Sequence, residues 1–175
     1  MVKDSYFLDL SRVPVFIGKN GEWKSYFEKK FNCILTVNSN SGEVIVDCED
    51  GYISFVISNI INAINHGHNP KNALKLEDEN YVLDYVDVKS KVKDSVRLKV
   101  VMGRIIGKNG VTRKIIEDTA TCSVFVGEDY VSIIGPFENI SLVHEALEML
   151  IKGVSHKSFY SYLEKNRVNM DRGLL

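Results

Sequence analysis

A pentapeptide that occurs twice constrains the fold of this chain more than any other feature. Ile17-Gly-Lys-Asn-Gly21 reappears letter for letter at Ile106-Gly-Lys-Asn-Gly110, 89 positions later. Five further pairs match in type at the same offset: Lys24 and Arg113, Phe27 and Ile116, Glu28 and Glu117, Cys33 and Cys122, Val37 and Val126. Because a match that extends beyond the motif indicates a duplicated structural unit, the 175 residues are predicted to form two copies of one domain.

The order of elements within a copy follows from local residue patterns. Apolar residues at helical spacing follow each pentapeptide, and two β-branched runs joined by turn residues then predict a hairpin. The predicted strands cover residues 31–37, 44–46, 122–126 and 131–134. Helical spacing returns from about Tyr52 to His66 and from Phe137 to Lys152, each followed by a glycine suited to a left-handed helix end.

The segments before each motif complete the fold. Opening strands are expected over residues 6–10 and 81–89. The stretch from Asp94 to Ile106 is predicted to be a helix because Asp94 can cap its N-terminus, and a strand is the alternative. A short helix is expected after Pro70, and the acidic segment 77–80 is the expected boundary. The predicted class is therefore α+β, with domains at 1–78 and 79–175, the second ending in a helical tail.

Charge is distributed unevenly, although the net charge is only −1. Residues 95–116 contain six basic residues and no acidic ones, whereas residues 43–87 contain nine acidic residues and two lysines. One part of the chain is thus suited to phosphates and another is not. With 45% hydrophobic residues the chain is expected to be folded, and it is expected to be soluble, intracellular and cytoplasmic, with no membrane contact.

The glycine turn points to a chemistry. A Gly-x-x-Gly turn between two helices leaves main-chain amides and a helix N-terminus open to a phosphate. Residues 104–110, Arg-Ile-Ile-Gly-Lys-Asn-Gly, resemble the signature of the type I (eukaryotic-type) KH domain, and the strand-first element order is similar too. In that module the turn clamps about four nucleotides of single-stranded RNA along an apolar groove. The resemblance implies two KH modules, each with a three-stranded antiparallel sheet packed against three helices.

The resemblance also assigns an RNA site in the second copy. Gly107, Lys108, Asn109 and Gly110 are expected to meet phosphates, with Ile105 and Ile106 as the groove floor and Val124 and Val126 on the facing strand. Arg104, Arg113 and Lys114 complete the predicted RNA-binding set. Gly18, Lys19, Asn20 and Gly21 form a possible second RNA site. Direct RNA binding there is left open, because Glu22 follows the turn and the rest of that copy is acidic.

Both copies depart from the common KH pattern at one place. Lys24 and Arg113 stand three residues beyond the second glycine, where many KH domains have an apolar residue. Together with the segments 148–153 and 156–164, the second half resembles the archaeal two-KH ribosome-assembly protein related to the eukaryotic partner-of-Nob-one protein. That resemblance implies binding of the 3′ region of small-subunit rRNA, mainly by the second domain. It also implies protein contacts for the first, with the alpha subunit of translation initiation factor two and other ribosome-assembly proteins as partners.

Other functions are less well supported. A nucleotide-binding P-loop would need one more residue between Gly103 and Gly107, and a Ser or Thr in place of Asn109. No catalytic set stands out, so no enzyme activity, cofactor or metal is expected. The three cysteines are odd in number and lack a Cys-x-x-Cys pair, so a disulfide framework is not expected and they are interpreted as buried thiols. The alternative function is a KH-fold protein scaffold that has lost RNA binding.

Overall fold

The computed structural model describes residues 2–171, with side chains described as far as residue 167. The chain divides into two compact units, residues 1–79 and residues 80–175, here called the first and second unit. Each unit contains one three-stranded antiparallel sheet with helices. The mixed α and β composition and the antiparallel sheets predicted from the sequence are confirmed.

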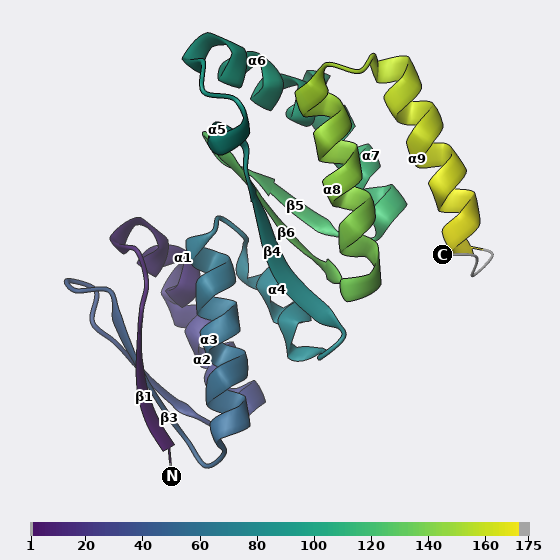
Figure 1. The fold of residues 1–175 in the computed structure, drawn as a ribbon. Coiled ribbons are helices and arrows are strands. Elements are labelled where there is room, and N and C mark those ends of the chain that lie inside the picture. Colours follow the sequence, from purple (N-terminus) through teal and green to yellow (C-terminus); the bar gives the residue numbers. More distant parts are fainter. Residues whose placement is uncertain (1, 172–175) are drawn as a thin grey trace. The chain divides into compact units, whose positions relative to one another are not determined.

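The first unit begins with a strand and ends with a short helix. Its elements are β1 (Val2–Phe7), η1 (Leu10–Arg12), α1 (Val13–Ile17), η2 (Lys19–Gly21), α2 (Glu22–Phe31), β2 (Ile34–Val37), β3 (Glu43–Cys48), α3 (Gly51–Asn65), α4 (Pro70–Ala73) and η3 (Leu74–Glu77). The sheet order is β1-β3-β2, and Figure 1 shows α1, α2 and α3 on the same side of this sheet. The predicted helix after Pro70 is confirmed as α4.

The alternation of buried and half-buried residues along β3 explains how the first unit forms its core. Val44, Val46 and Cys48 are buried, and the residues between them are half-buried. The apolar residues of α3 recur at helical spacing, and Ile57, Ile60 and Ile64 are almost fully buried. Asp50 begins this helix by accepting a hydrogen bond from the Tyr52 amide at 2.9 Å. The core thus lies between the sheet and the helices on its inner side.

The second unit repeats this order, with a longer helix before the glycine turn and an additional helix at its end. Its elements are β4 (Tyr81–Asp87), α5 (Val88–Lys91), α6 (Ser95–Ile106), η4 (Lys108–Gly110), α7 (Val111–Ala120), β5 (Ser123–Val126), β6 (Tyr130–Pro136), α8 (Phe137–Lys152) and α9 (His156–Asp171). The sheet order is β4-β6-β5, which matches the order in the first unit. Within the described part of the chain, no helix combines the length and the apolarity needed to cross a membrane.

The helix ends of the second unit agree with the predicted signals. Asp94 caps α6 by accepting a hydrogen bond from the Arg97 amide at 2.7 Å, so the helix predicted there is confirmed. Gly153 ends α8 with a φ of 89°, a left-handed conformation that glycine adopts without strain. The tail helix α9 then packs against α7 and α8, with Phe159 and Leu163 almost completely buried (Figure 1). These two residues anchor the helix to the unit.

The opening strands differ from their predicted limits. The first runs from Val2 to Phe7 instead of 6–10, and the second ends at Asp87 instead of residue 89. Asp87 accepts a hydrogen bond from the Ser90 amide at 3.0 Å, which starts the short helix α5. Val88 therefore belongs to that helix and is buried there, although alternation with Val86 predicted a strand position.

The cysteines of the first unit correct a prediction. Cys33 and Cys48 form a disulfide with their Cα atoms 4.7 Å apart, so the expectation of buried thiols alone was wrong. The reason is the register of the hairpin. Ile34 pairs with Asp47, which brings Cys33, just before β2, opposite Cys48 at the end of β3. Such a pair of residues in an antiparallel sheet lies within reach of a disulfide.

The second unit has a glycine at the corresponding place. Ser123 pairs with Ile134, so Gly135 lies opposite Cys122. A Cβ atom on Gly135 would approach the Cys122 Sγ to 2.2 Å, so the sulfur occupies the space that a side chain would need. Cys33 and Cys122 nevertheless occupy equivalent buried positions before the second strand of each unit, as their spacing predicted.

Candidate nucleic-acid interface

The two glycine turns have the same backbone conformation. Gly107 has a φ of 74° and Gly18 a φ of 76°, and the two asparagines that follow, Asn109 and Asn20, lie at 54° and 55°. These positive values favour glycine, and asparagine is among the residues that tolerate them best. The repeated pentapeptide therefore specifies one local structure twice.

The two glycines of the second turn have different roles. A Cβ atom on Gly107 would lie 2.2 Å from Thr112 Oγ1 and 2.7 Å from the Thr112 amide nitrogen, so only glycine fits there. A Cβ atom on Gly110 would have no neighbour within 4 Å. The first glycine is thus needed for packing against α7, while the second leaves open backbone that a ligand can approach.

The turn leads directly into the N-terminus of α7. This helix starts at Val111, whose amide donates to the Lys108 carbonyl, and the amides that follow in the first turn of a helix lack partners within the helix. Gly110 precedes it with a left-handed conformation and no side chain that caps the helix. Open amides at a helix N-terminus bind anions. The arrangement can therefore hold a phosphate of a nucleic-acid backbone.

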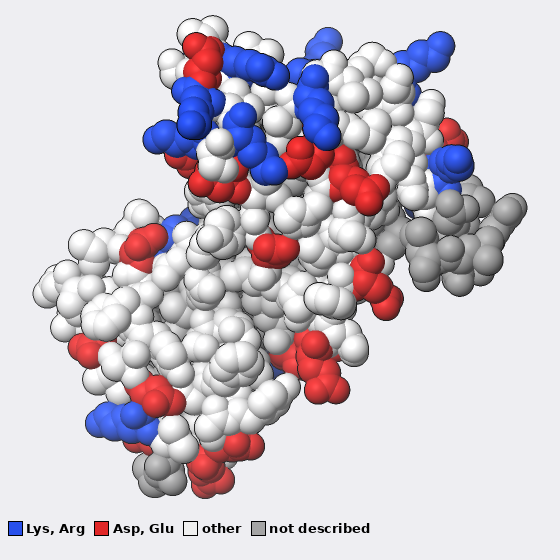
Figure 2. All heavy atoms as spheres, in the orientation of Figure 1, with Lys and Arg blue, Asp and Glu red and all other residues white. Residues whose placement is uncertain are grey.

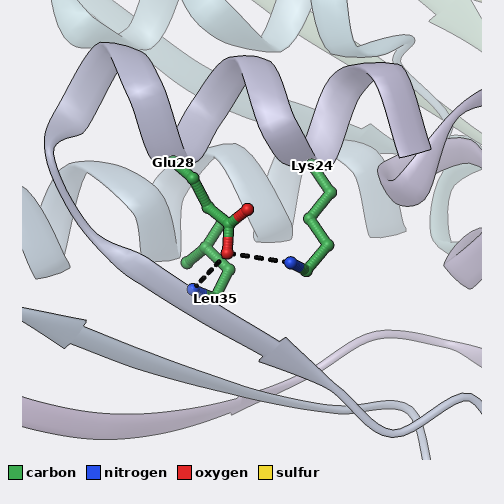
Figure 3. A network of polar contacts seen from close by, with 3 residues as sticks. All are labelled: Lys24, Glu28 and Leu35. Atoms are coloured by element: carbon green, nitrogen blue, oxygen red, sulfur yellow. Dashed lines mark hydrogen bonds and ion pairs between the residues drawn. The ribbon is translucent and has the colours of Figure 1, made fainter.

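A glutamate on the helix after each turn explains the shared departure from the KH pattern. In the first unit, Glu28 Oε1 accepts hydrogen bonds from Lys24 Nζ at 2.8 Å and from the Leu35 amide at 2.9 Å (Figure 3). Burial of the Glu28 carboxyl raises its pKa, but the hydrogen bonds from Lys24 and Leu35, together with the Lys24 charge, outweigh this effect. The net pKa of Glu28 is lowered. Lys24 therefore stabilises a carboxylate that connects α2 to β2.

The second unit contains the same connection with a looser ion pair. Glu117 Oε1 accepts a hydrogen bond from the Val124 amide at 2.7 Å, which connects α7 to β5. Arg113 Nε lies 3.9 Å from Glu117 Oε2, and the Arg113 side chain is 45% exposed compared with 30% for Lys24. Arg113 is therefore less tightly engaged than Lys24. The glutamates were missed as structural residues, although their spacing of four from Lys24 and Arg113 was a readable signal.

The Arg104 side chain is bound within the fold, whereas the sequence analysis placed it in the RNA site. Its guanidinium donates hydrogen bonds to the carbonyls of Leu150, at 2.9 Å, and Val154, and so holds α6 against the end of α8. Arg12 in the first unit does the same for the carbonyls of Ile64 and His68. Two of the Arg104 nitrogen atoms are thus used within the fold. A contact between Arg104 and RNA stays a prediction.

The apolar residues of the predicted groove divide into buried and exposed members. Ile105 and Val124 are buried in the core of the second unit, while Val126 is half-buried and Ile106 is 40% exposed. A ligand could thus contact Ile106 and Val126 directly. Ile105 and Val124 support the surface from below, and their burial, at 0% and 5% exposure, disfavours the direct RNA contact predicted for them.

The cations of the second turn are exposed. Lys108 lies in the turn and Lys114 in the first half of α7, and neither forms an ion pair with a side chain that the structure describes. Figure 2 shows further Lys and Arg side chains gathered over α5 and α6. The second unit has 14 basic and 12 acidic residues, and the first unit has eight basic and 11 acidic. The two identical turns therefore lie in different electrostatic surroundings.

Known proteins share this arrangement. The family model described as the eukaryotic-type KH domain (KH-domain type I), in the form of the second KH domain of PNO1, matches residues 82–168. A KH domain-containing protein of Methanocaldococcus jannaschii is 34% identical over 164 residues, which cover 92% of this chain and 72% of the relative. The chain belongs to the PNO1-like family of KH proteins. The resemblance found in the sequence is confirmed.

Further PNO1-like proteins extend the comparison. A chain in the crystal structure of an a/eIF2alpha-aDim2p-rRNA complex from Pyrococcus horikoshii matches with a TM-score of 0.83 and 32% identity, covering 96% of this chain and 95% of that one. The pre-rRNA-processing protein pno1 of Emericella nidulans is 32% identical over 100 residues, which cover 56% of this chain and 38% of that relative. More than half of that relative therefore lies outside the matched segment.

Proposed function

We propose that this chain is a non-enzymatic RNA-binding factor of small-subunit ribosome assembly that binds single-stranded RNA through the Gly107–Gly110 turn. The observation that carries the proposal is an open Gly-x-x-Gly turn at a helix N-terminus, within a 22-residue stretch that has six basic and no acidic residues. The Pyrococcus horikoshii relative was crystallised in a complex with rRNA, and the fungal relative is named for pre-rRNA processing. Both relatives support RNA as the ligand.

The proposed site is the exposed part of the predicted set. Phosphates would meet the Gly107–Gly110 turn and Lys114, while bases would lie against Ile106 and Val126. Arg113, three residues beyond Gly110, adds positive charge that its long ion pair with Glu117 leaves available. The target sequence would be the 3′ region of small-subunit rRNA, met in the cytoplasm, as the family resemblance implies.

The first unit is proposed to be a second KH domain that contacts proteins. Its element order, its sheet order and the geometry of its turn repeat those of the second unit. Its excess of acidic residues disfavours RNA and suits a partner with a basic face. The alpha subunit of initiation factor two is the first partner to test, because the Pyrococcus horikoshii complex contains that protein.

Filter binding to short single-stranded RNA at 50 and 200 mM salt tests the proposal. A site that engages about four phosphates should lose about 50-fold in affinity over this range, because counterion release makes binding to single strands salt-dependent. An RNA with the 3′-terminal sequence of the small-subunit rRNA should bind more tightly than a scrambled RNA of equal composition. No binding at 50 mM salt, with binding to the alpha subunit retained, would favour the protein scaffold instead.

A further inference from the structure

A pocket in the first unit lies between α2 and the segment formed by α4 and η3. Its volume is about 420 Å³, and it is lined by Glu22, Trp23 and Tyr26 from α2, by Lys71 from α4 and by Leu74 from η3. Trp23 is half-buried and Tyr26 is 47% exposed, and their ring centroids lie 5.7 Å apart. Two large aromatic side chains that open to solvent together are a feature that folding of this unit does not explain.

The second unit shows what lies on the corresponding helix face there. Thr112 and Ile115 stand 89 positions after Trp23 and Tyr26, at the same spacing on α7. Helix α9 packs against α7, and the Tyr160 hydroxyl lies 3.2 Å from Thr112 Oγ1. Thr112 is 1% exposed, and Ile115 is half-buried. The helix face that carries the two open aromatic residues in the first unit is therefore in contact with a helix in the second.

The first unit contains only the start of the equivalent helix. Helix α4 begins three residues after Gly67, and α9 begins three residues after Gly153. The fourth residues of these helices, Ala73 and Phe159, are both 0% exposed, so the two helices dock alike at their first turn. Helix α4 then ends and η3 carries the chain to Glu77, whereas α9 has 16 residues. The pocket thus lies where the first unit has a short segment and the second has a long helix.

The chemistry of the lining residues favours a protein over a small molecule or RNA. Trp and Tyr are enriched among the residues that contribute most to protein interfaces. Pockets for small molecules orient their ligands with a few precisely placed polar groups, whereas every residue that lines this pocket is exposed or half-buried. The Glu22 carboxylate disfavours a phosphate. An open apolar surface between helices is suited to the apolar face of an amphipathic helix.

We propose that this pocket is a docking site for an amphipathic helix of a partner protein, which lies against α2 as α9 lies against α7. This inference rests on the proposed role of the first unit in contacting proteins. Glu22 and Lys71 come from opposite walls, and neither forms an ion pair with a side chain that the structure describes. The docked helix therefore has an apolar residue between the two walls, a basic residue near Glu22 and an acidic residue near Lys71. In the second unit α9 already occupies the corresponding surface.

The test uses Trp23 as its reporter, because it is the single tryptophan of the chain. Incorporation of 5-fluorotryptophan gives the full chain one fluorine NMR signal, which comes from the pocket itself. The probes are three helical peptides of about 16 residues that differ only in a central anchor, which is Leu, Phe or Met. Each peptide has a Lys one turn before the anchor and a Glu one turn after it. A peptide with the same composition in scrambled order is the negative control.

At least one of the three peptides should shift the Trp23 signal saturably, with a Kd below about 1 mM, and the scrambled peptide should not. Tyr26→Ala removes one aromatic wall and should weaken binding about tenfold. Tyr52→Ala is the matched control and should change nothing, because Tyr52 is 55% exposed on α3 and does not line the pocket. Lys71→Glu should weaken binding about threefold at low salt, and a peptide with Lys in place of its Glu should restore it.

No saturable shift with any of the three peptides, or equal affinities of the unchanged chain and Tyr26→Ala, would overturn the inference. A shift caused only by single-stranded RNA, or only by raising the concentration of the chain itself, would assign the pocket to RNA or to a second copy and would also overturn it. Binding of the alpha subunit of initiation factor two to the full chain is measured separately. Binding of that subunit without binding of the peptides would refute the inference alone, whereas its failure to bind would refute the partner proposed for the first unit.

Discussion

The two units share the geometry of their glycine turns and differ in the charges that surround those turns. Gly18 and Gly107 have nearly the same φ, and the helix after each turn is connected to the facing strand by a glutamate. The 22 residues at 95–116 contain six basic and no acidic residues, whereas the matching residues 6–27 contain three basic and two acidic ones. The turn thus provides the same backbone geometry twice, while the neighbouring side chains decide how strongly an anion is attracted.

The units also differ in how they are stabilised. The first is closed by the Cys33–Cys48 disulfide and ends in the four-residue helix α4 and a short 3-10 turn. The second has Gly135 opposite Cys122, and the 16-residue helix α9 buries Phe159 and Leu163 against its core. The first unit is thus stabilised by a covalent link, and the second unit is stabilised by the additional apolar burial of its last helix.

Loss of the disulfide should have the largest effect and should affect only the first unit. A loop closed over 15 residues is stabilised by about 3 kcal/mol in the chain-entropy model. The variant Cys33→Ala/Cys48→Ala should therefore speed hydrogen exchange of the globally protected amides of β2 and β3 by about 100-fold. Exchange is followed by mass spectrometry on the full chain.

The second unit is the internal control for that measurement, because it contains a single cysteine. Its amides in β5 and β6 should exchange at the same rate in the variant and in the unchanged chain. Equal acceleration in both units, or none in β2 and β3, would show that the disulfide does not stabilise the first unit selectively.

Replacing the cation that follows each turn should distinguish an effect on stability from an effect on RNA binding. Lys24→Met should destabilise the first unit by about 0.5 kcal/mol, because the pair with Glu28 spans one helical turn, and should leave RNA affinity unchanged. Arg113→Met should lower RNA affinity about fivefold at 0.1 M salt through loss of one phosphate contact. Its effect on stability should be smaller, since its ion pair is 3.9 Å long. Chemical denaturation and fluorescence anisotropy measure the two effects.

The pH dependence identifies the Lys24 effect as electrostatic. The pKa of Glu28 in the folded chain lies below its ordinary value of 4.5. Its ionised form therefore stabilises the unit fully above pH 4.5 and loses this effect as pH falls through the folded pKa. The stability difference between Lys24→Met and the unchanged chain should shrink over the same range. A difference that is constant with pH, or an RNA effect of Lys24→Met equal to that of Arg113→Met, would contradict the assigned roles.

Much of the fold could be predicted from the sequence, because the residues that determine it act on the backbone only a few positions away. The repeated pentapeptide, the Asp94 cap and Gly153 each determine a backbone conformation within a few residues, and the structure has those conformations. The Cys33–Cys48 disulfide was missed because it depends on hairpin register, a long-range property that residue types do not encode directly. The limit of β4 was missed because the Asp87 cap overrides the alternation that continues into Val88.

The position of the candidate site could be predicted from the sequence, but the burial and contacts of its residues could not. The motif located the turn, but burial separates Ile106 and Val126 from Ile105 and Val124, and burial depends on packing against β6 and α8. The engagement of Arg104 with the carbonyls of Leu150 and Val154 could not be predicted for the same reason.

The same charge reversal made in each turn tests most directly whether RNA binding belongs to the second unit. Lys108→Asp/Asn109→Asp and Lys19→Asp/Asn20→Asp make the same change in the same backbone, at exposed positions. Binding of the full chain to a twelve-nucleotide single-stranded RNA is measured at 0.1 M salt, with thermal unfolding as the check on folding. The change in the second turn should weaken binding about 100-fold, because carboxylates would face phosphates. The change in the first turn should weaken it by less than about threefold, since few phosphates are expected near that turn. Equal losses from both variants, or a larger loss from the first turn, would contradict the assignment of RNA binding to the second unit.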